Sequence, residues 1–161
     1  MLSDFLIPLA ITTAVGAGLN GGIFFAFSTF VMSALRRLPA PEGITAMQEI
    51  NVTAVTAAFM SLFFGTAVLS VAVIVTAVAD WSSPATALAV IGAAIYLVGA
   101  IGTTVTFNVP RNDALAAVNA RAGDAAELWR RYHTSWTAGN HVRTVSCLAA
   151  AILLLVATRV G

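Results

Sequence analysis

Residues 52–79 read VTAVTAAFMSLFFGTAVLSVAVIVTAVA, and this stretch contains no charged side chain. A helix needs about 20 predominantly apolar residues to cross the hydrocarbon core of a bilayer, so the stretch predicts a transmembrane helix. Long runs with few or no charges predict three further transmembrane helices, at about residues 5–35, 85–107 and 140–160. The sequence therefore predicts an all-α fold, a four-helix transmembrane bundle that forms a single domain over residues 1–161.

The composition of the whole chain agrees with insertion in a membrane. Of its 161 residues, 59% are hydrophobic and 9% are charged, whereas a soluble domain carries about 25% charged residues. The lipid bilayer is therefore an expected partner, and we expect no nucleic-acid partner. The single cysteine, Cys147, excludes an internal disulfide and is typical of a small core residue in a helix.

The distribution of arginine predicts which ends of the helices face the cytoplasm. One arginine, Arg159, lies on the predicted side of the two termini. Seven lie in or next to the two longer connections on the other side: Arg36, Arg37, Arg111, Arg121, Arg130, Arg131 and Arg143. Because cytoplasmic loops carry an excess of basic residues, we expect connections 36–51 and 108–139 in the cytoplasm and both termini outside it. We expect an integral protein of a bacterial inner membrane.

The connections are predicted to contain helices of their own. Residues 44–51 are amphipathic and predict an extension of the second transmembrane helix out of the membrane. Pro110 predicts the end of the third helix, followed by a short helix at 114–121. Residues 124–136 predict a cytoplasmic amphipathic helix between helices 3 and 4 that lies in the membrane interface. Its apolar face is formed by Leu128, Trp129, Tyr132 and Trp136. Glycine-rich faces on the first and third helices are compatible with a homo-oligomer.

Two polar clusters lie where apolar spans meet water on the same predicted side of the membrane. One is Asn140-His141-Val142-Arg143, at the start of the fourth helix, and the other is Asn108-Val109-Pro110-Arg111-Asn112-Asp113, at the end of the third. Polar and ionisable groups close to hydrocarbon are costly and often functional, so the two clusters are the candidate site. His141 is the side chain of its cluster that can act as a base near neutral pH.

The candidate residues also have simpler interpretations. Arg143 can reach the headgroups from the helix end and serve as an anchor. His141 can be an interfacial hydrogen-bonding residue. Asn20, in the middle of the first helix, can either bond a neighbouring helix or face a pocket. Asn51 is predicted to enter the membrane roughly level with Asn140.

Two other classes of function stay open at this point. A haem- or metal-binding membrane protein would use His133 and His141 as ligands. On one continuous helix their eight-residue spacing corresponds to about 12 Å, which is too far for one iron. The sequence has no HExxH or CxxC motif, and we expect no metal site and no cofactor. A non-enzymatic scaffold or lipid-binding bundle is the second alternative.

Four runs of sequence carry a resemblance to a known family. They are residues 22–32 (GIFFAFSTFVM), 46–52 (AMQEINV), 107–112 (FNVPRN) and 140–144 (NHVRT). In this order, over nearly the whole chain, they resemble the anthrone oxygenase-like family of small four-helix membrane proteins. Fungal members of that family are linked to the oxidation of polyketide anthrones to anthraquinones with O₂, without an obvious cofactor.

The resemblance implies an oxidoreductase, a monooxygenase that acts without a cofactor on an apolar aromatic small molecule at the membrane interface. On this hypothesis His141 is the base and Arg143 stabilises the enolate oxyanion. The residues that would position or stack on the substrate are Asn20, Asn51, Asn108, Asn112, Trp129, Trp136 and Asn140. Gly139 and the run Thr56-Ala57-Ala58 depart from the family pattern, in which an aromatic and an Asn-Pro-aromatic run are common there. These departures weaken a direct transfer of the activity.

Overall fold

A computed structural model describes residues 5–79, 81 and 83–160, and over these residues the chain is helical without a strand. The elements, in chain order, are α1 (Leu6–Ala26), η1 (Phe27–Val31), α2 (Met32–Leu35), α3 (Ala40–Thr53), α4 (Ala57–Ala79), α5 (Pro84–Ile95), η2 (Tyr96–Gly102), η3 (Thr104–Asn108), α6 (Val109–Ala116) and α7 (Ala125–Ala157). The η elements are π-helical, with backbone hydrogen bonds between residues five apart instead of four. This architecture confirms the predicted all-α fold class.

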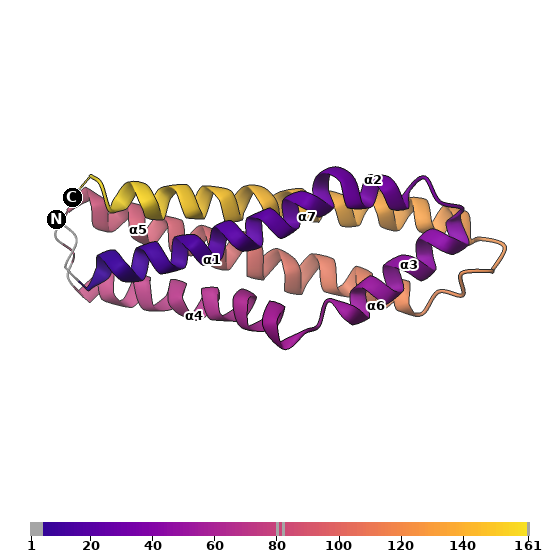
Figure 1. Cartoon of the computed structure of the whole chain (residues 1–161), viewed down its shortest axis with the longest axis horizontal. Coiled ribbons are helices and arrows are strands. Elements are labelled where there is room, and N and C mark those ends of the chain that lie inside the picture. The colour runs from indigo at the N-terminus through magenta and orange to yellow at the C-terminus, as the bar shows by residue number, and fades with distance from the viewer. Residues whose placement is uncertain (1–4, 80, 82, 161) are drawn as a thin grey trace.

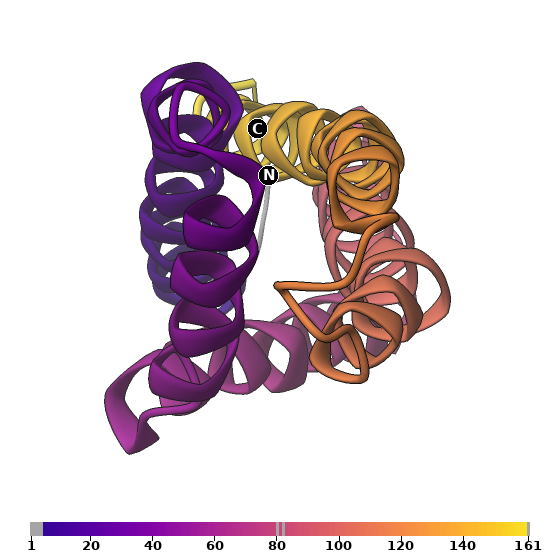
Figure 2. The same ribbon diagram turned by 90° about the vertical axis from the view of Figure 1, so that its right-hand side faces the viewer.

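Four helical rods in the described part of the chain are long and apolar enough to cross a membrane: Leu6–Leu35, α4, Pro84–Ala116 and α7. The chain is therefore an integral membrane protein. α1 packs against α4 and α7, and α5 packs against the same two helices, so the four rods form a ring (Figure 2). The start of α1 and the end of α7 lie at one end of the bundle, and α2, α3 and α6 lie at the other (Figure 1).

The bundle interior at the end that holds the start of α1 consists mainly of small side chains. The buried alanines there are Ala10, Ala14, Ala77, Ala85, Ala89, Ala93 and Ala157. Small residues let helix backbones approach closely in lipid, where apolar side chains gain nothing by leaving a hydrocarbon solvent. The outward side chains of the same region are apolar and exposed, for example Val68, Val75 and Ile152. This surface suits contact with lipid tails.

At the other end of the bundle, long and aromatic side chains replace alanine in the interior. The buried residues are Met32, Leu35, Ile44, Met47, Leu115, Ala125, Trp129, Tyr132 and Trp136. Trp129 stacks on Tyr132 with ring centroids 5.7 Å apart. A Cβ atom at Gly43 would lie 2.9 Å from the Trp129 ring, so glycine at this position allows α3 to approach α7.

The separate amphipathic helix predicted at 124–136 is not confirmed. Residues 125–136 form the first part of α7, which continues without a break to Ala157. The aromatic face does not meet lipid headgroups, because Trp129, Tyr132 and Trp136 are buried against α2 and α3. The fourth helix consequently begins at Ala125 instead of residue 140. At 1.5 Å per residue its 33 residues reach about 50 Å, well beyond a bilayer core of about 30 Å.

Two other predicted helix boundaries are wrong. Residues 44–51 belong to α3 and do not extend the second span, because residues 54–56 interrupt the helix. A new helix, α4, starts after this break, where the Thr56 hydroxyl accepts a hydrogen bond from the Phe59 N–H at 3.2 Å. The third rod continues through Pro110 to Ala116, because Pro110 occupies the first turn of α6, directly after η3. The predicted helix at 114–121 is therefore absent, and the connection shrinks to residues 117–124.

Candidate functional site

Two π-helical segments direct polar side chains at α7. η1 carries Ser28, η3 carries Thr104 and Asn108, and both segments contact α7. A π turn holds one residue more than an α turn and changes the direction in which side chains leave the helix, and such turns are frequent at functional sites. Ser28 and Thr104 consequently reach the polar part of α7 from two different rods.

Asn140 is the centre of a hydrogen-bond network between α1 and α7. Its Nδ2 donates to the Phe24 carbonyl oxygen and to the Ser28 Oγ, both at 2.7 Å. Its Oδ1 accepts a hydrogen bond from Arg143 Nη2, also at 2.7 Å. The side chain is fully buried, so all these bonds are shielded from water. Asn140 therefore fixes the position of the Arg143 guanidinium.

Arg143 points into the bundle and not outward to the headgroups. Its side chain is 6% exposed, and its guanidinium carbon lies 4.3 Å from the centroid of the Phe24 ring and 5.1 Å from that of Trp136. A second donor, Nη1, lies 3.3 Å from the Thr104 hydroxyl oxygen, while Nε is buried without a hydrogen-bond partner. Cation–π contacts of this kind stabilise an arginine that is removed from water.

No carboxylate balances the Arg143 charge in the described part of the chain. The ion pairs among the described residues join Glu127 to Arg130 and Arg131, on an exposed part of α7. Burying a cation without a counter-ion is costly. The arrangement therefore favours a ligand that brings negative charge to Arg143.

A cavity of about 350 Å³ lies next to the Arg143 guanidinium. It is bounded by α1, η1, α3, the break at 54–56, the start of α4, η3, α6 and α7. Its apolar walls are formed by Ile23, Phe24, Phe27, Met47, Ile50, Ala54, Val55, Phe59, Met60, Val109 and Trp136. Its polar groups belong to Asn51, Thr56, Thr104, Asn112, Asn140 and Arg143. Of all these lining residues, Arg143 alone is ionisable, so the cavity is an apolar space with one fixed positive charge.

Asn112 supplies a second donor at the cavity. Its Oδ1 accepts hydrogen bonds from Trp136 Nε1 at 2.7 Å and from the Tyr132 hydroxyl at 3.0 Å. The indole N–H can only donate, which assigns the bonded atom of Asn112 as the oxygen. The Nδ2 group of Asn112 is thus left to donate to a molecule in the cavity.

A family model described as anthrone oxygenase matches residues 57–153, which is more than half of the chain. The chain belongs to the anthrone oxygenase family. The anthrone oxygenase match covers Thr104, Asn112, Trp136, Asn140 and Arg143, whereas α1, η1 and α3 contribute the cavity wall that precedes it. No curated protein and no solved structure matches the chain.

Five of the residues predicted from the sequence line the cavity of this anthrone oxygenase-family protein: Asn51, Asn112, Trp136, Asn140 and Arg143. Asn51 lies on α3, Asn112 lies on α6 and the other three lie on α7, so the tertiary fold brings together three separate parts of the sequence.

His141 is not part of this site. It is exposed and does not line the cavity, although Asn140 and Arg143 on either side are buried. Successive residues on an α-helix point about 100° apart, so His141 is turned away from Asn140. The geometry therefore gives no support to His141 as the base.

Three further predicted residues pack the bundle and do not line the cavity. Asn20 bonds the Gly16 carbonyl oxygen of its own helix at 2.9 Å and approaches Thr66 of α4, as expected for a residue that joins neighbouring helices. Asn108 donates to the Trp136 carbonyl oxygen at 3.1 Å. Trp129 covers Gly43.

The sequence interpretation missed Ser28 and Thr104, which hold Asn140 and Arg143, and the wall formed by Met47 and Ile50. Two adjacent threonines at 103–104 within an apolar helix are a weak signal for Thr104. Nothing in the sequence marks Ser28, because its position depends on the π turn.

The two histidines proposed as haem ligands in the alternative function lie on the same continuous helix. His133 and His141 are eight residues apart on α7, which corresponds to about 12 Å. His133 Nε2 also lies 2.9 Å from the Met32 carbonyl oxygen and donates to it. The pair cannot bind one iron from opposite sides in this arrangement. The described residues contain no group of three or more His, Cys, Asp or Glu that could hold a metal ion.

Proposed function

We propose that this protein is a cofactor-independent oxygenase that uses O₂ to convert an anthrone-like aromatic compound into a quinone in the cavity beside Arg143. The observation that carries the proposal is a buried guanidinium without a carboxylate partner at the wall of an aromatic-lined cavity of about 350 Å³. Membership of the anthrone oxygenase family supports the same reaction class.

The reaction requires stabilisation of an enolate. An anthrone carries a CH₂ group between two aromatic rings, opposite a carbonyl group. Loss of one CH₂ proton places negative charge on the carbonyl oxygen, where Arg143 and the Asn112 Nδ2 group would stabilise it. O₂ then bonds to the former CH₂ carbon to give a peroxide, which accepts the proton back. Loss of water leaves one oxygen atom as the new carbonyl group, so one O₂ yields one quinone and one water.

The cavity supplies this electrostatic stabilisation without supplying a side-chain base. In the described part of the chain, neither a carboxylate nor a histidine lines the cavity. Arg143 would favour the enolate over the neutral anthrone, and the proton would leave to water where the cavity meets the exposed break at 54–56. In this route water accepts the proton, and His141 has no part in the reaction.

The apolar walls suit a flat ring system. The rings of Phe27 and Trp136 lie 5.8 Å apart on one side, and Phe59 at the start of α4 lies on another. Aromatic rings pack favourably in offset or edge arrangements at such distances. Val55 in the break at 54–56 is 68% exposed and lines the cavity, which gives an apolar compound in the bilayer a way in.

Oxygen uptake by the purified protein with emodin anthrone tests the proposal. The rate without protein is subtracted, and we expect one O₂ consumed for each anthraquinone formed. Removal of an oxyanion donor typically lowers kcat by about 100-fold or more, so Arg143→Met should lose at least that factor. Arg143→Lys keeps the charge and should recover part of the rate. An Arg143→Met variant that is folded and oxidises emodin anthrone at the wild-type rate would show that the proposed role of Arg143 is wrong.

Two measurements separate the alternatives. His141→Ala should keep the protein-dependent rate, because the imidazole lies outside the cavity. A loss of activity in that variant would restore His141 as the base. An active sample without a Soret or charge-transfer absorption band supports a reaction without haem or metal, and a band that rises in proportion to activity would contradict it.

A further inference from the structure

A second cavity, of about 310 Å³, lies between the end of the first rod and α7. Its lining residues are Ser28, Thr29, Met32, Ser33, Arg36, Arg37, His133 and Thr137. All of them except Met32 carry polar side chains, and none carries a carboxylate. The cavity therefore differs from the one beside Arg143 in its chemistry, because it combines hydroxyl groups with two guanidinium groups.

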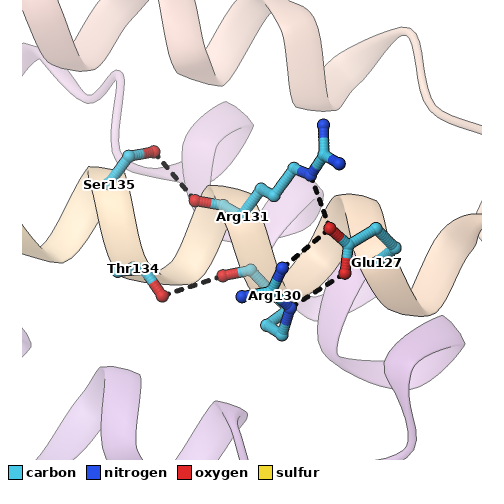
Figure 3. A network of polar contacts seen from close by, with 5 residues as sticks. All are labelled: Glu127, Arg130, Arg131, Thr134 and Ser135. Carbon is cyan, nitrogen blue, oxygen red and sulfur yellow. Dashed lines mark hydrogen bonds and ion pairs between the residues drawn. The ribbon is translucent and has the colours of Figure 1, made fainter.

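The guanidinium groups of this cavity carry charge that no ion pair uses. Among the described residues, the ion pairs both involve Glu127, which binds Arg130 at 2.7 Å and Arg131 at 2.6 Å (Figure 3). Arg36 and Arg37 follow α2 in the turn that leads to α3, and both are exposed. Two adjacent cations beside a polar cavity favour an anionic ligand.

The inner wall of the cavity has a hydroxyl group without a partner. The Thr137 Oγ1 atom is buried and makes no hydrogen bond. His133 Nε2 donates to the Met32 carbonyl oxygen, so the ring is held in place with Nδ1 free. Buried polar atoms are almost always paired, so the Thr137 hydroxyl is available to bond a ligand in the cavity. Phosphate oxygens are acceptors that the Thr137 hydroxyl and the guanidinium groups can share.

The cavity extends toward the Trp129 side of α7. A neighbouring cavity of about 400 Å³ shares Arg36 and His133 with it and adds Trp129, Arg130 and Thr134. The two spaces together are large enough for more than an inorganic ion. Arg130 remains tied to Glu127, so the free positive charge stays with the pair that follows α2.

The sequence around the cavity is typical of a membrane interface. Residues 5–35 carry no charge, and Arg36 and Arg37 follow at once. Phe30, one turn before Ser33, is 63% exposed on the outside of the first rod. An apolar surface thus leads directly to a polar, cationic cavity. Arginines that follow an apolar span lie at headgroup level, where they attract anionic lipids.

We propose that this cavity binds the phosphate headgroup of an anionic phospholipid. The phosphate would lie between Arg36, Arg37 and the Thr137 hydroxyl, and the acyl chains would lie along Phe30 and the apolar surface of the first rod. The site is separate from the cavity beside Arg143 and does not depend on the proposed oxygenase reaction.

Native mass spectrometry of the detergent-purified full-length protein tests the proposal. The protein is titrated with phosphatidylglycerol, with phosphatidylcholine, and with inorganic phosphate. We expect phosphatidylglycerol to bind more tightly than phosphatidylcholine. In the double variant Arg36→Gln/Arg37→Gln its affinity should fall roughly 30-fold, given the usual contribution of an arginine near a membrane surface. The matched control Arg121→Gln/Arg159→Gln removes the same charge from exposed positions outside the cavity and should bind like the wild type.

A second variant tests the cavity without a change of charge. Thr137→Val replaces the hydroxyl by a methyl group of similar size, so it should remain folded and bind phosphatidylglycerol severalfold more weakly. Equal affinities for the two lipids, or unchanged binding in both the double variant and Thr137→Val, would overturn the proposal. If inorganic phosphate binds with the same dependence on Arg36 and Arg37 while phosphatidylglycerol does not, the site takes a free anion and the lipid assignment is wrong.

Discussion

Replacement of Asn140 by alanine should destabilise the bundle far more than the same change at Asn20. Both asparagines are fully buried on apolar helices, and both lose the same atoms. They differ in what they bond. Asn140 joins α7 to the Phe24 carbonyl oxygen, to Ser28 and to Arg143, whereas Asn20 bonds mainly its own helix.

The expected size of the difference follows from the bonds. A neutral hydrogen bond contributes about 1 kcal/mol net and one to a charged group about 1.5–3 kcal/mol, so Asn140→Ala should cost on the order of 3–5 kcal/mol. For Asn20, the contact to Thr66 is 3.5 Å long and the other bond lies within α1. Its loss should cost about 1 kcal/mol before the cavity left behind is counted. The cavity contributes similarly to both variants and cancels in the comparison, which leaves about 2–4 kcal/mol.

Unfolding of the two variants by SDS in mixed micelles, followed by tryptophan fluorescence, measures the difference in the free energy of unfolding. A double-mutant cycle with Arg143→Met then isolates the bond between Asn140 and Arg143, which should account for the largest share. If Asn140→Ala is no less stable than Asn20→Ala, the network between α1 and α7 does not hold the guanidinium in place, and the reasoning fails.

Three further predictions concern packing. Gly43→Ala should destabilise the protein by about 1–3 kcal/mol, because the new methyl group meets the Trp129 ring. Gly18→Ala, with open space around it, should be neutral or stabilising. Equal melting temperatures of the two variants would contradict the predicted difference. Cys147 is fully buried, so a maleimide should label it only in unfolded protein, and rapid labelling of folded protein would disprove the packing. Gln48→Ala removes two hydrogen bonds, one to the Leu115 carbonyl oxygen at the end of α6 and one to the Val118 carbonyl oxygen after it. Backbone hydrogen exchange in the connection from α6 to α7 should therefore accelerate, and an unchanged exchange rate would show that other contacts hold this connection in place.

The four spans could be predicted because lipid restricts the outer surface of a membrane protein to apolar side chains, whatever the interior contains. Helix periodicity also placed Asn140 and Arg143 on one face, since residues three apart point the same way. That Asn51 and Asn112 share a cavity with Asn140 and Arg143 could be predicted only in part. The sequence places all four residues near the same predicted membrane interface, but it does not show which helices are neighbours.

The differences between the predictions and the structure have physical reasons. The sequence interpretation groups His141 with Asn140 and Arg143, although adjacent helical residues point in different directions. The apolar residues in 124–136 have the same sequence spacing whether that face meets lipid or packs on another helix. The sequence does not reveal that α3 covers this face. The break at 54–56 contains neither glycine nor proline, so no local signal announces it. The side of the membrane on which each end lies remains a prediction.

The π turn at η1 accommodates one residue more than a regular α-helix would hold between the same buried positions. Two α turns span about seven residues, yet the buried side chains of Phe24 and Met32 are eight positions apart. The wide turn absorbs the extra residue: Phe24 is buried with Phe63 and Cys147 before the turn, and Met32 is buried with Met47 and Trp129 after it. In this protein the π turn places the Ser28 hydroxyl against Asn140, so the polar network depends on the helical register of the first rod as well as on the identity of its residues.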